Sequence, residues 1–97
     1  MNVLPTALPG VLIVEPQVWR DPRGYFFESF HARKADAKGL PREFVQDNES
    51  FSQRGTVRGL HCQLTKPQGK LVRILTGAVL DVAVDIRRGS PTFGRWV

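Results

Sequence analysis

Residues 54–63 read Arg-Gly-Thr-Val-Arg-Gly-Leu-His-Cys-Gln and bring two arginines, a histidine and the only cysteine of the chain into ten positions. Lys70 follows seven residues after Gln63 and opens a second apolar run. A histidine can accept a proton near neutral pH, and a lysine can stabilise the enolate that forms when a proton leaves a carbon next to a carbonyl. These residue types predict proton chemistry on an anionic substrate. A structural histidine beside surface lysine and arginine would fit the same pattern equally well.

The composition of the chain is that of an ordinary globular protein. Its 97 residues are 41% hydrophobic and 24% charged, which indicates one small domain or part of a larger one. The formal net charge of +5 favours anionic partners such as nucleic acid, a membrane surface or a phosphorylated small molecule. The basic residues are scattered, so a solvated basic surface is the alternative interpretation.

Nothing in the sequence predicts export or membrane insertion. A single cysteine cannot form an internal disulfide, and no apolar run approaches the roughly 20 residues of a membrane span. The short apolar run at residues 11–14 lacks the preceding basic region of a signal peptide. The expectation is a cytoplasmic protein without a membrane partner.

Short β-branched and aromatic runs, separated by glycine and proline, follow one another along most of the chain. They predict strands over residues 11–19, 25–30, 44–48, 56–63, 70–76 and 78–86, with another beginning in 92–97. The only helix-forming run covers residues 31–39. This pattern predicts an antiparallel β-sandwich or barrel, and the strand-like ending suggests a sheet that is meant to continue.

Strand alternation places several polar side chains on defined faces. Glu28 shares a face with Phe26, and Gln46 shares a face with Asn48. Arg58 and His61 are three positions apart, so in a regular strand their side chains point to opposite faces. Both reach one pocket only if Gly59 carries a bulge or Arg58 lies at the rim.

Several other kinds of site are disfavoured. A metal site is not expected, because the position two residues after His61 is Gln63, a poor transition-metal ligand. Cys62 is expected to be a buried structural residue rather than a nucleophile. A nucleic-acid-binding barrel is disfavoured because the aromatic residues cluster in one strand instead of alternating with basic residues.

Five blocks of the sequence resemble the dTDP-4-dehydrorhamnose 3,5-epimerase family. They are residues 21–28, 44–48, 54–63, 68–73 and 81–94, in the family's order. The resemblance implies an all-β fold, a cupin-like antiparallel jelly-roll barrel with one short helix near residues 31–39. It also implies that residues 1–97 are the N-terminal part of a single epimerase domain, so that the barrel is incomplete and the chain truncated.

The resemblance further implies a reaction and its residues. The family inverts C3 and C5 of dTDP-4-dehydro-6-deoxy-D-glucose to give dTDP-4-dehydro-L-rhamnose, without a metal or redox cofactor, and it forms homodimers that share N-terminal strands. By this resemblance His61 is the general base and Lys70 the cation that faces the enolate. The substrate-binding positions are Arg23, Phe26, Glu28, Gln46, Asn48, Arg58 and Lys70.

The sequence also departs from the family's pattern. Cys62 stands where the family usually has an aromatic residue, and the loop between Gln63 and Lys70 is one residue shorter. The tyrosine acid and the carboxylate that pairs with the histidine are expected outside these 97 residues, since Tyr25 lies in a different motif. The 97 residues alone are therefore expected to show negligible turnover. The alternatives are an inactive sugar-nucleotide binder and a non-functional fragment, and epimerisation at one carbon rather than two stays open.

Overall fold

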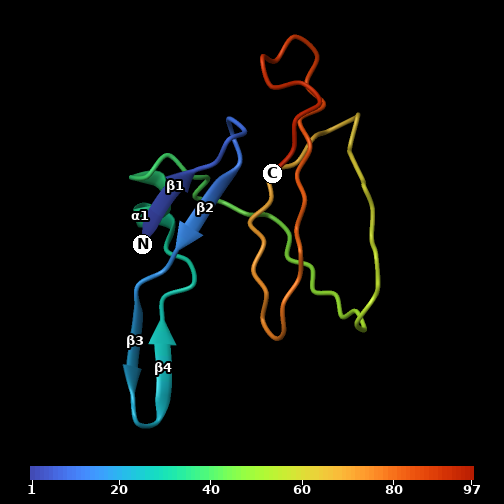
Figure 1. The fold of residues 1–97 in the computed structure, drawn as a ribbon. Helices are drawn as coiled ribbons and strands as arrows, with labels where there is room; N and C mark the ends of the chain where they lie inside the picture. Colours follow the sequence, from blue (N-terminus) through green and yellow to red (C-terminus); the bar gives the residue numbers. More distant parts are fainter. The chain divides into compact units, whose positions relative to one another are not determined.

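The structure is a computed structural model that describes all of residues 1–97 (Figure 1). The chain forms two compact units, one made of Met1–Val45 with Asp81–Val97 and the other of Gln46–Leu80. All named secondary structure lies in the first unit, as two antiparallel strand pairs followed by one short helix. That helix is too short to cross a membrane.

The first strand pair joins β1 (Asn2–Pro5) to β2 (Leu12–Glu15) in antiparallel register. Thr6 closes the connecting turn, because its backbone N–H and its Oγ1 both donate to the carbonyl of Val11, at 3.3 and 2.9 Å. Leu8, in the same turn, is one of the few buried side chains. β1 was not predicted, since four residues ending in proline show too little alternation of apolar and polar side chains to indicate a strand.

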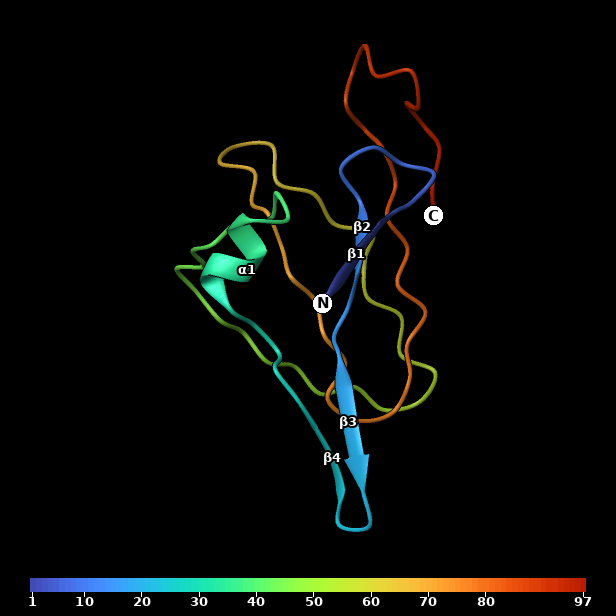
Figure 2. The same ribbon diagram turned by 90° about the vertical axis from the view of Figure 1, so that its left-hand side faces the viewer.

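The second strand pair is a tight hairpin of β3 (Val18–Asp21) and β4 (Gly24–Phe27) (Figure 2). The prediction of one strand over residues 11–19 was therefore wrong. The chain leaves β2 just before Pro16 and enters β3 two residues later, because proline has no N–H to donate to a ladder. β4 also ends earlier than the strand predicted over residues 25–30.

The turn of this hairpin is built by its own side chains. Asp21 Oδ1 accepts a hydrogen bond from the backbone N–H of Arg23 at 2.8 Å, across Pro22. Gly24 then adopts a φ of 139°, which a residue with a Cβ rarely adopts. In the Asp-Pro-Arg-Gly sequence, the aspartate thus supplies a hydrogen-bond acceptor, the proline a fixed φ, and the glycine the ability to adopt a positive φ.

The helix predicted over residues 31–39 is present but shorter. α1 (Ala32–Asp36) is capped by His31, whose Nδ1 accepts from the backbone N–H of Lys34 at 3.5 Å. The chain then turns out of the helix through Gly39, which has a φ of 74°. The helix packs through Ala35, which is 1% exposed.

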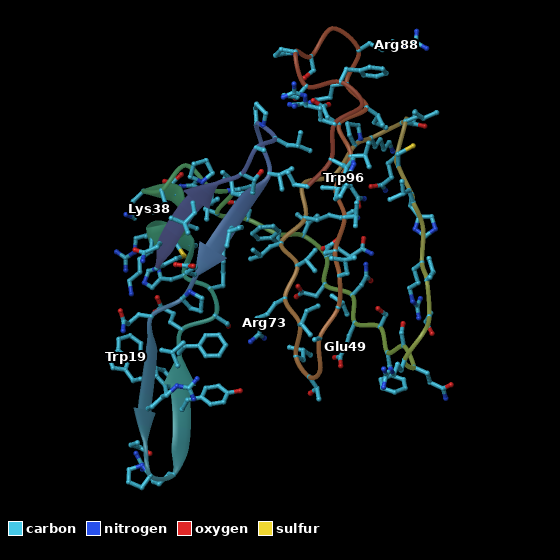
Figure 3. All side chains as sticks on the ribbon, viewed as in Figure 1. Trp19, Lys38, Glu49, Arg73, Arg88 and Trp96 are labelled. Atoms are coloured by element: carbon cyan, nitrogen blue, oxygen red, sulfur yellow. The ribbon has the colours of Figure 1, made fainter.

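The end of the chain pairs with residues just before it, but the strands predicted over residues 78–86 and 92–97 are reduced to an isolated bridge. Ala83 and Val97 exchange two backbone hydrogen bonds of 2.9 and 3.0 Å, and Val84 bridges to Trp96 in antiparallel sense. The regular pairing is limited to this short stretch. Figure 3 shows Trp96 on the paired segment and Arg88 at the tip of the turn between the two runs.

The turn between these two runs is organised around Asp85, whose side chain is 1% exposed. Arg87 donates to its carboxylate from the backbone N–H, from Nε and from Nη2, at 2.9, 3.0 and 3.0 Å. The hydroxyls of Ser90 and Thr92 each donate to Oδ2 at 2.6 Å. These hydrogen bonds, those from Arg87 foremost, hold the pKa of Asp85 well below the usual range of a carboxyl group.

The same arginine also links the two ends of the first unit. Nη2 of Arg87 donates to the backbone carbonyl of Pro9 at 3.0 Å, across 78 positions of sequence. The turn between β1 and β2 is thereby tied to the C-terminal segment through one guanidinium group.

The second unit differs from the prediction most. Strands were predicted over residues 44–48, 56–63 and 70–76, but none of these segments belongs to a strand ladder, and every residue of Gln46–Leu80 is exposed. A segment becomes a strand only when a neighbour accepts and donates its backbone hydrogen bonds. Residues 1–97 supply no such neighbour to these three segments.

Replacing Asp85 by asparagine should loosen the C-terminal segment. The amide keeps the size of the carboxylate but loses its charge and one acceptor, while Arg87, Ser90 and Thr92 keep their donors. The expected result is a lower Tm and faster amide hydrogen exchange at Gly94, whose N–H donates to the backbone carbonyl of residue 85 at 2.7 Å. Asp81→Asn is the matched control, because Asp81 is exposed and makes none of these contacts.

The pH dependence has a defined sign. Because folding lowers the pKa of Asp85, its contribution to stability is complete above the unfolded carboxyl value of about 3.9 and is lost as the pH falls below it. Gly94 exchange protection should therefore fall in acid in the wild type and stay flat in Asp85→Asn. The same acid profile in both proteins would contradict this role.

Candidate active site

The guanidinium group of Arg58 is held by uncharged hydrogen-bond acceptors. Its Nε donates to Ser52 Oγ at 2.8 Å, and its Nη2 donates to the backbone carbonyl of Phe51 at 3.0 Å. A turn at Arg54 and Gly55 reverses the chain between these residues and Arg58. No carboxylate pairs with the guanidinium group, so no neighbouring negative charge offsets its field.

The backbone next to Arg58 is irregular at Gly59. A bulge at Gly59 was one of the two ways in which Arg58 and His61 could serve one pocket, the other being a position of Arg58 at the rim. Gly59 has a φ of 103°, and a Cβ built on it would lie 3.3 Å from the backbone N of His61 and 3.7 Å from its Nδ1. A side chain at this position would be strained and would press on the histidine. Glycine here allows the close approach of the backbone to His61.

The predicted pair Gln46 and Asn48 lies side by side as expected. Nε2 of Gln46 donates to Oδ1 of Asn48 at 3.3 Å. This contact confirms that the two amides share a face, while each keeps further hydrogen-bonding groups free for a ligand.

The two residues predicted to act on the substrate are not joined by a hydrogen bond. Nζ of Lys70 donates to Oε1 of Gln68 at 3.4 Å, and His61 has no hydrogen bond or ion pair. Both side chains are exposed. The amide partner of Lys70 carries no charge, so no carboxylate competes with an anion for this lysine.

Arg23 and Phe26 lie together at the end of the β3–β4 hairpin. They line a shallow depression of about 220 Å³ with Asp21, Gly24 and Tyr25. Nη2 of Arg23 lies 2.6 Å from Oδ2 of Asp21, and this hydrogen bond holds the pKa of the Asp21 carboxyl below its ordinary value. In contrast to Arg58, Arg23 thus has a carboxylate partner.

Glu28 is bound to a lysine from α1. Nζ of Lys34 lies 2.8 Å from Oε1 of Glu28, and this hydrogen bond lowers the pKa of the Glu28 carboxyl. A lysine of the helix therefore favours the ionised form of a predicted substrate-binding residue. Figure 3 shows Lys38, the other lysine of this region, beside α1.

The structure tests the prediction that was made for Cys62. Cys62 is exposed, so the prediction of a buried structural cysteine was wrong. Its run, residues 56–63, has no partner strand to bury it. No group of three or more His, Cys, Asp or Glu side chains lies together in a way that could hold a metal ion.

Sequence reasoning missed Ser52 and Lys34, the partners of Arg58 and Glu28. Both pairs are six positions apart, a spacing that neither strand alternation nor helical periodicity marks as a contact. Only the path of the chain around each turn brings them together.

Comparison with known proteins identifies the family. The model of the dTDP-4-dehydrorhamnose 3,5-epimerase family matches residues 5–97. The chain belongs to this family.

Curated members of the epimerase family align with the whole chain. The Pseudomonas aeruginosa dTDP-4-dehydrorhamnose 3,5-epimerase is 56% identical over 98 residues, covering 100% of this chain and 54% of that enzyme. A Streptomyces niveus protein named dTDP-4-dehydrorhamnose 3-epimerase is 45% identical over 98 residues, covering 99% of this chain and 47% of that protein. The chain spans about half the length of the curated relatives it matches.

A solved structure confirms the predicted fold class. The Legionella pneumophila Philadelphia 1 dTDP-6-deoxy-D-glucose-3,5-epimerase, crystallised in complex with dTDP-4-keto-L-rhamnose, superposes with a TM-score of 0.91 at 52% identity. The match covers 99% of this chain and 52% of that chain. The 97 residues therefore follow the path of an epimerase of the cupin-like jelly-roll class without closing a barrel.

Replacing Lys34 by methionine should raise the pKa of Glu28 toward its ordinary value, because the methionine keeps a long apolar side chain but donates no hydrogen bond. Glu28 would then take up a proton at a higher pH than in the wild type. A titration followed by the ¹³C signal of the Glu28 carboxyl measures this change. Lys38→Met is the control and should leave the Glu28 titration in place; an unmoved titration in Lys34→Met would contradict the assignment.

Proposed function

We propose that the protein carrying this chain converts dTDP-4-dehydro-6-deoxy-D-glucose into dTDP-4-dehydro-L-rhamnose by inverting C3 and C5, in dTDP-L-rhamnose biosynthesis. The observation that carries the proposal is the 56% identity to a 3,5-epimerase over the whole chain. It is supported by the presence of His61 and Lys70, to which the family resemblance assigns the roles of base and enolate-facing cation. The protein would be an isomerase.

The chemistry follows from the position of the carbonyl group. C3 and C5 both neighbour the C4 carbonyl, so loss of a proton from either carbon gives an enolate rather than an unstabilised carbanion. In this proposal His61 takes the proton, and the Lys70 ammonium group stabilises the charge on the enolate oxygen. A proton returned to the opposite face of the carbon completes the inversion. No electrons are gained or lost, so the reaction calls for no redox cofactor.

The substrate is a dianionic nucleotide sugar, and the candidate residues suit its parts. Arg23, Arg58 and Lys70 are cations for the diphosphate and the sugar oxygens. Gln46 and Asn48 offer amide groups to hydroxyls, and Glu28 can accept a hydrogen bond from the thymine N–H. Phe26 is 69% exposed on β4, which leaves a ring face for stacking on the base.

We also propose that the full protein is a homodimer. The β3–β4 hairpin exposes Trp19 and Phe26 at 55% and 69%, with ring centroids 6.1 Å apart. Figure 3 shows Trp19 standing out from β3. A two-stranded hairpin with exposed aromatic residues gains stability from a covering surface. A monomeric mass by light scattering would count against this proposal.

A second candidate is inversion at C3 alone, which the similarity to the Streptomyces niveus 3-epimerase favours. The two activities differ in where solvent deuterium enters the sugar. Incorporation at C3 without C5 would select this candidate over the 3,5-epimerase.

Replacing His61 by alanine should slow deuterium exchange at both carbons by roughly 10²- to 10⁴-fold, the usual contribution of a general base. The measurement is proton NMR of dTDP-4-dehydro-6-deoxy-D-glucose with the full-length protein in D₂O. His31→Ala is the matched control, because His31 is the other histidine of residues 1–97 and caps a short helix. Exchange at wild-type rate in His61→Ala would remove His61 from the mechanism.

A further inference from the structure

We infer that Ser52 is a positioning residue for Arg58 and prepares that arginine to bind the diphosphate of the nucleotide sugar. The inference rests on the proposed function, which supplies the ligand. Its basis is the pair of contacts that Ser52 and the neighbouring carbonyl of Phe51 make to the guanidinium group.

These contacts occupy one defined edge of the guanidinium group. Ser52 Oγ accepts from Nε at 2.8 Å, and the carbonyl of Phe51 accepts from Nη2 at 3.0 Å. Two acceptors from consecutive residues fix both the position and the plane of a rigid, planar group. The hydrogen bonds use the Nε–H and one Nη2–H, which lie along the same side.

The end of the guanidinium group, formed by Nη1 and Nη2, is left for a ligand. A guanidinium group has five N–H donors, so both donors of Nη1 and one of Nη2 remain without a partner. The Nη1 and Nη2 donors at the end of the group form a fork that matches two oxygens of a phosphate. The end of Arg58 that can bind a phosphate is therefore left without a protein partner.

The charge of Arg58 also remains available. A hydroxyl and a carbonyl orient the guanidinium without neutralising it, whereas Arg23 is paired with the carboxylate of Asp21 at 2.6 Å. Orienting a long side chain before binding also reduces the conformational entropy that the ligand complex would otherwise cost. Ser52 thus adds affinity through Arg58 without contacting the ligand itself.

The inference is tested by calorimetric titration with dTDP of the full-length wild type and of five variants. Ser52→Ala removes the acceptor, Ser52→Thr restores it, and Arg58→Ala removes the arginine; the fourth is the double variant with both alanines. Gln53→Ala is the matched control, because Gln53 neighbours Ser52 and its side chain does not contact Arg58.

Ser52→Ala should weaken dTDP binding by about three- to tenfold, and Arg58→Ala by roughly thirtyfold or more. Ser52→Thr and Gln53→Ala should bind as the wild type does. In the Arg58→Ala background, loss of the Ser52 hydroxyl should not weaken dTDP binding further, since the serine acts on binding through the arginine.

The outcomes separate the inference from the proposed function. Failure of the wild type to bind dTDP, or full affinity in Arg58→Ala, would overturn the proposed role of Arg58 and the inference with it. A loss in Arg58→Ala with unchanged affinity in Ser52→Ala would overturn the inference alone. An equal loss from Ser52→Ala with and without Arg58 would also overturn it, because the serine would then act independently of the arginine.

Discussion

The buried carboxylate of Asp85 is the interaction on which the ordered part of this chain depends. Its oxygens accept hydrogen bonds from Arg87, Ser90 and Thr92. A buried carboxylate is stable only when its oxygens have such partners. Arg87 then reaches Pro9 and ties the two ends of the first unit together. With only Leu8 and Ala35 as buried hydrophobic side chains, this polar network supplies order that an apolar core usually provides.

The charged candidate site residues differ in whether a group of opposite charge is paired with them. Arg23 and Glu28 are paired with opposite charges, so their local fields are largely cancelled before a substrate arrives. Arg58 and Lys70 are oriented by uncharged acceptors and keep their charge for an anion. Under the proposed function, Arg58 and Lys70 would have charges available for the diphosphate and for the enolate.

Much of the local structure was predictable from the residues. The hairpin turn follows from Asp21, Pro22 and Gly24, and the helix position follows from the run after His31. The contact between Gln46 and Asn48 agrees with the shared face predicted for them, although residues 44–48 form no strand. Strand extents were not predictable, because Pro16 divides one predicted strand and residues 46–80 have no partners for their backbone groups. The prediction that Cys62 is buried was wrong for the same reason, because its run of residues has no partner strand.

The amino-acid sequence by itself determined the family, the fold class and the chemical types of the site residues. These depend on residue identity and order, and the motifs around Arg23, His61 and Lys70 carry them without any coordinates. Only the tertiary structure decided which groups touch: Ser52 with Arg58, Lys34 with Glu28, and Arg87 with Pro9. Such contacts depend on how turns return the chain to itself, and a turn's path is set by backbone geometry and pairing that spacing along the sequence does not encode.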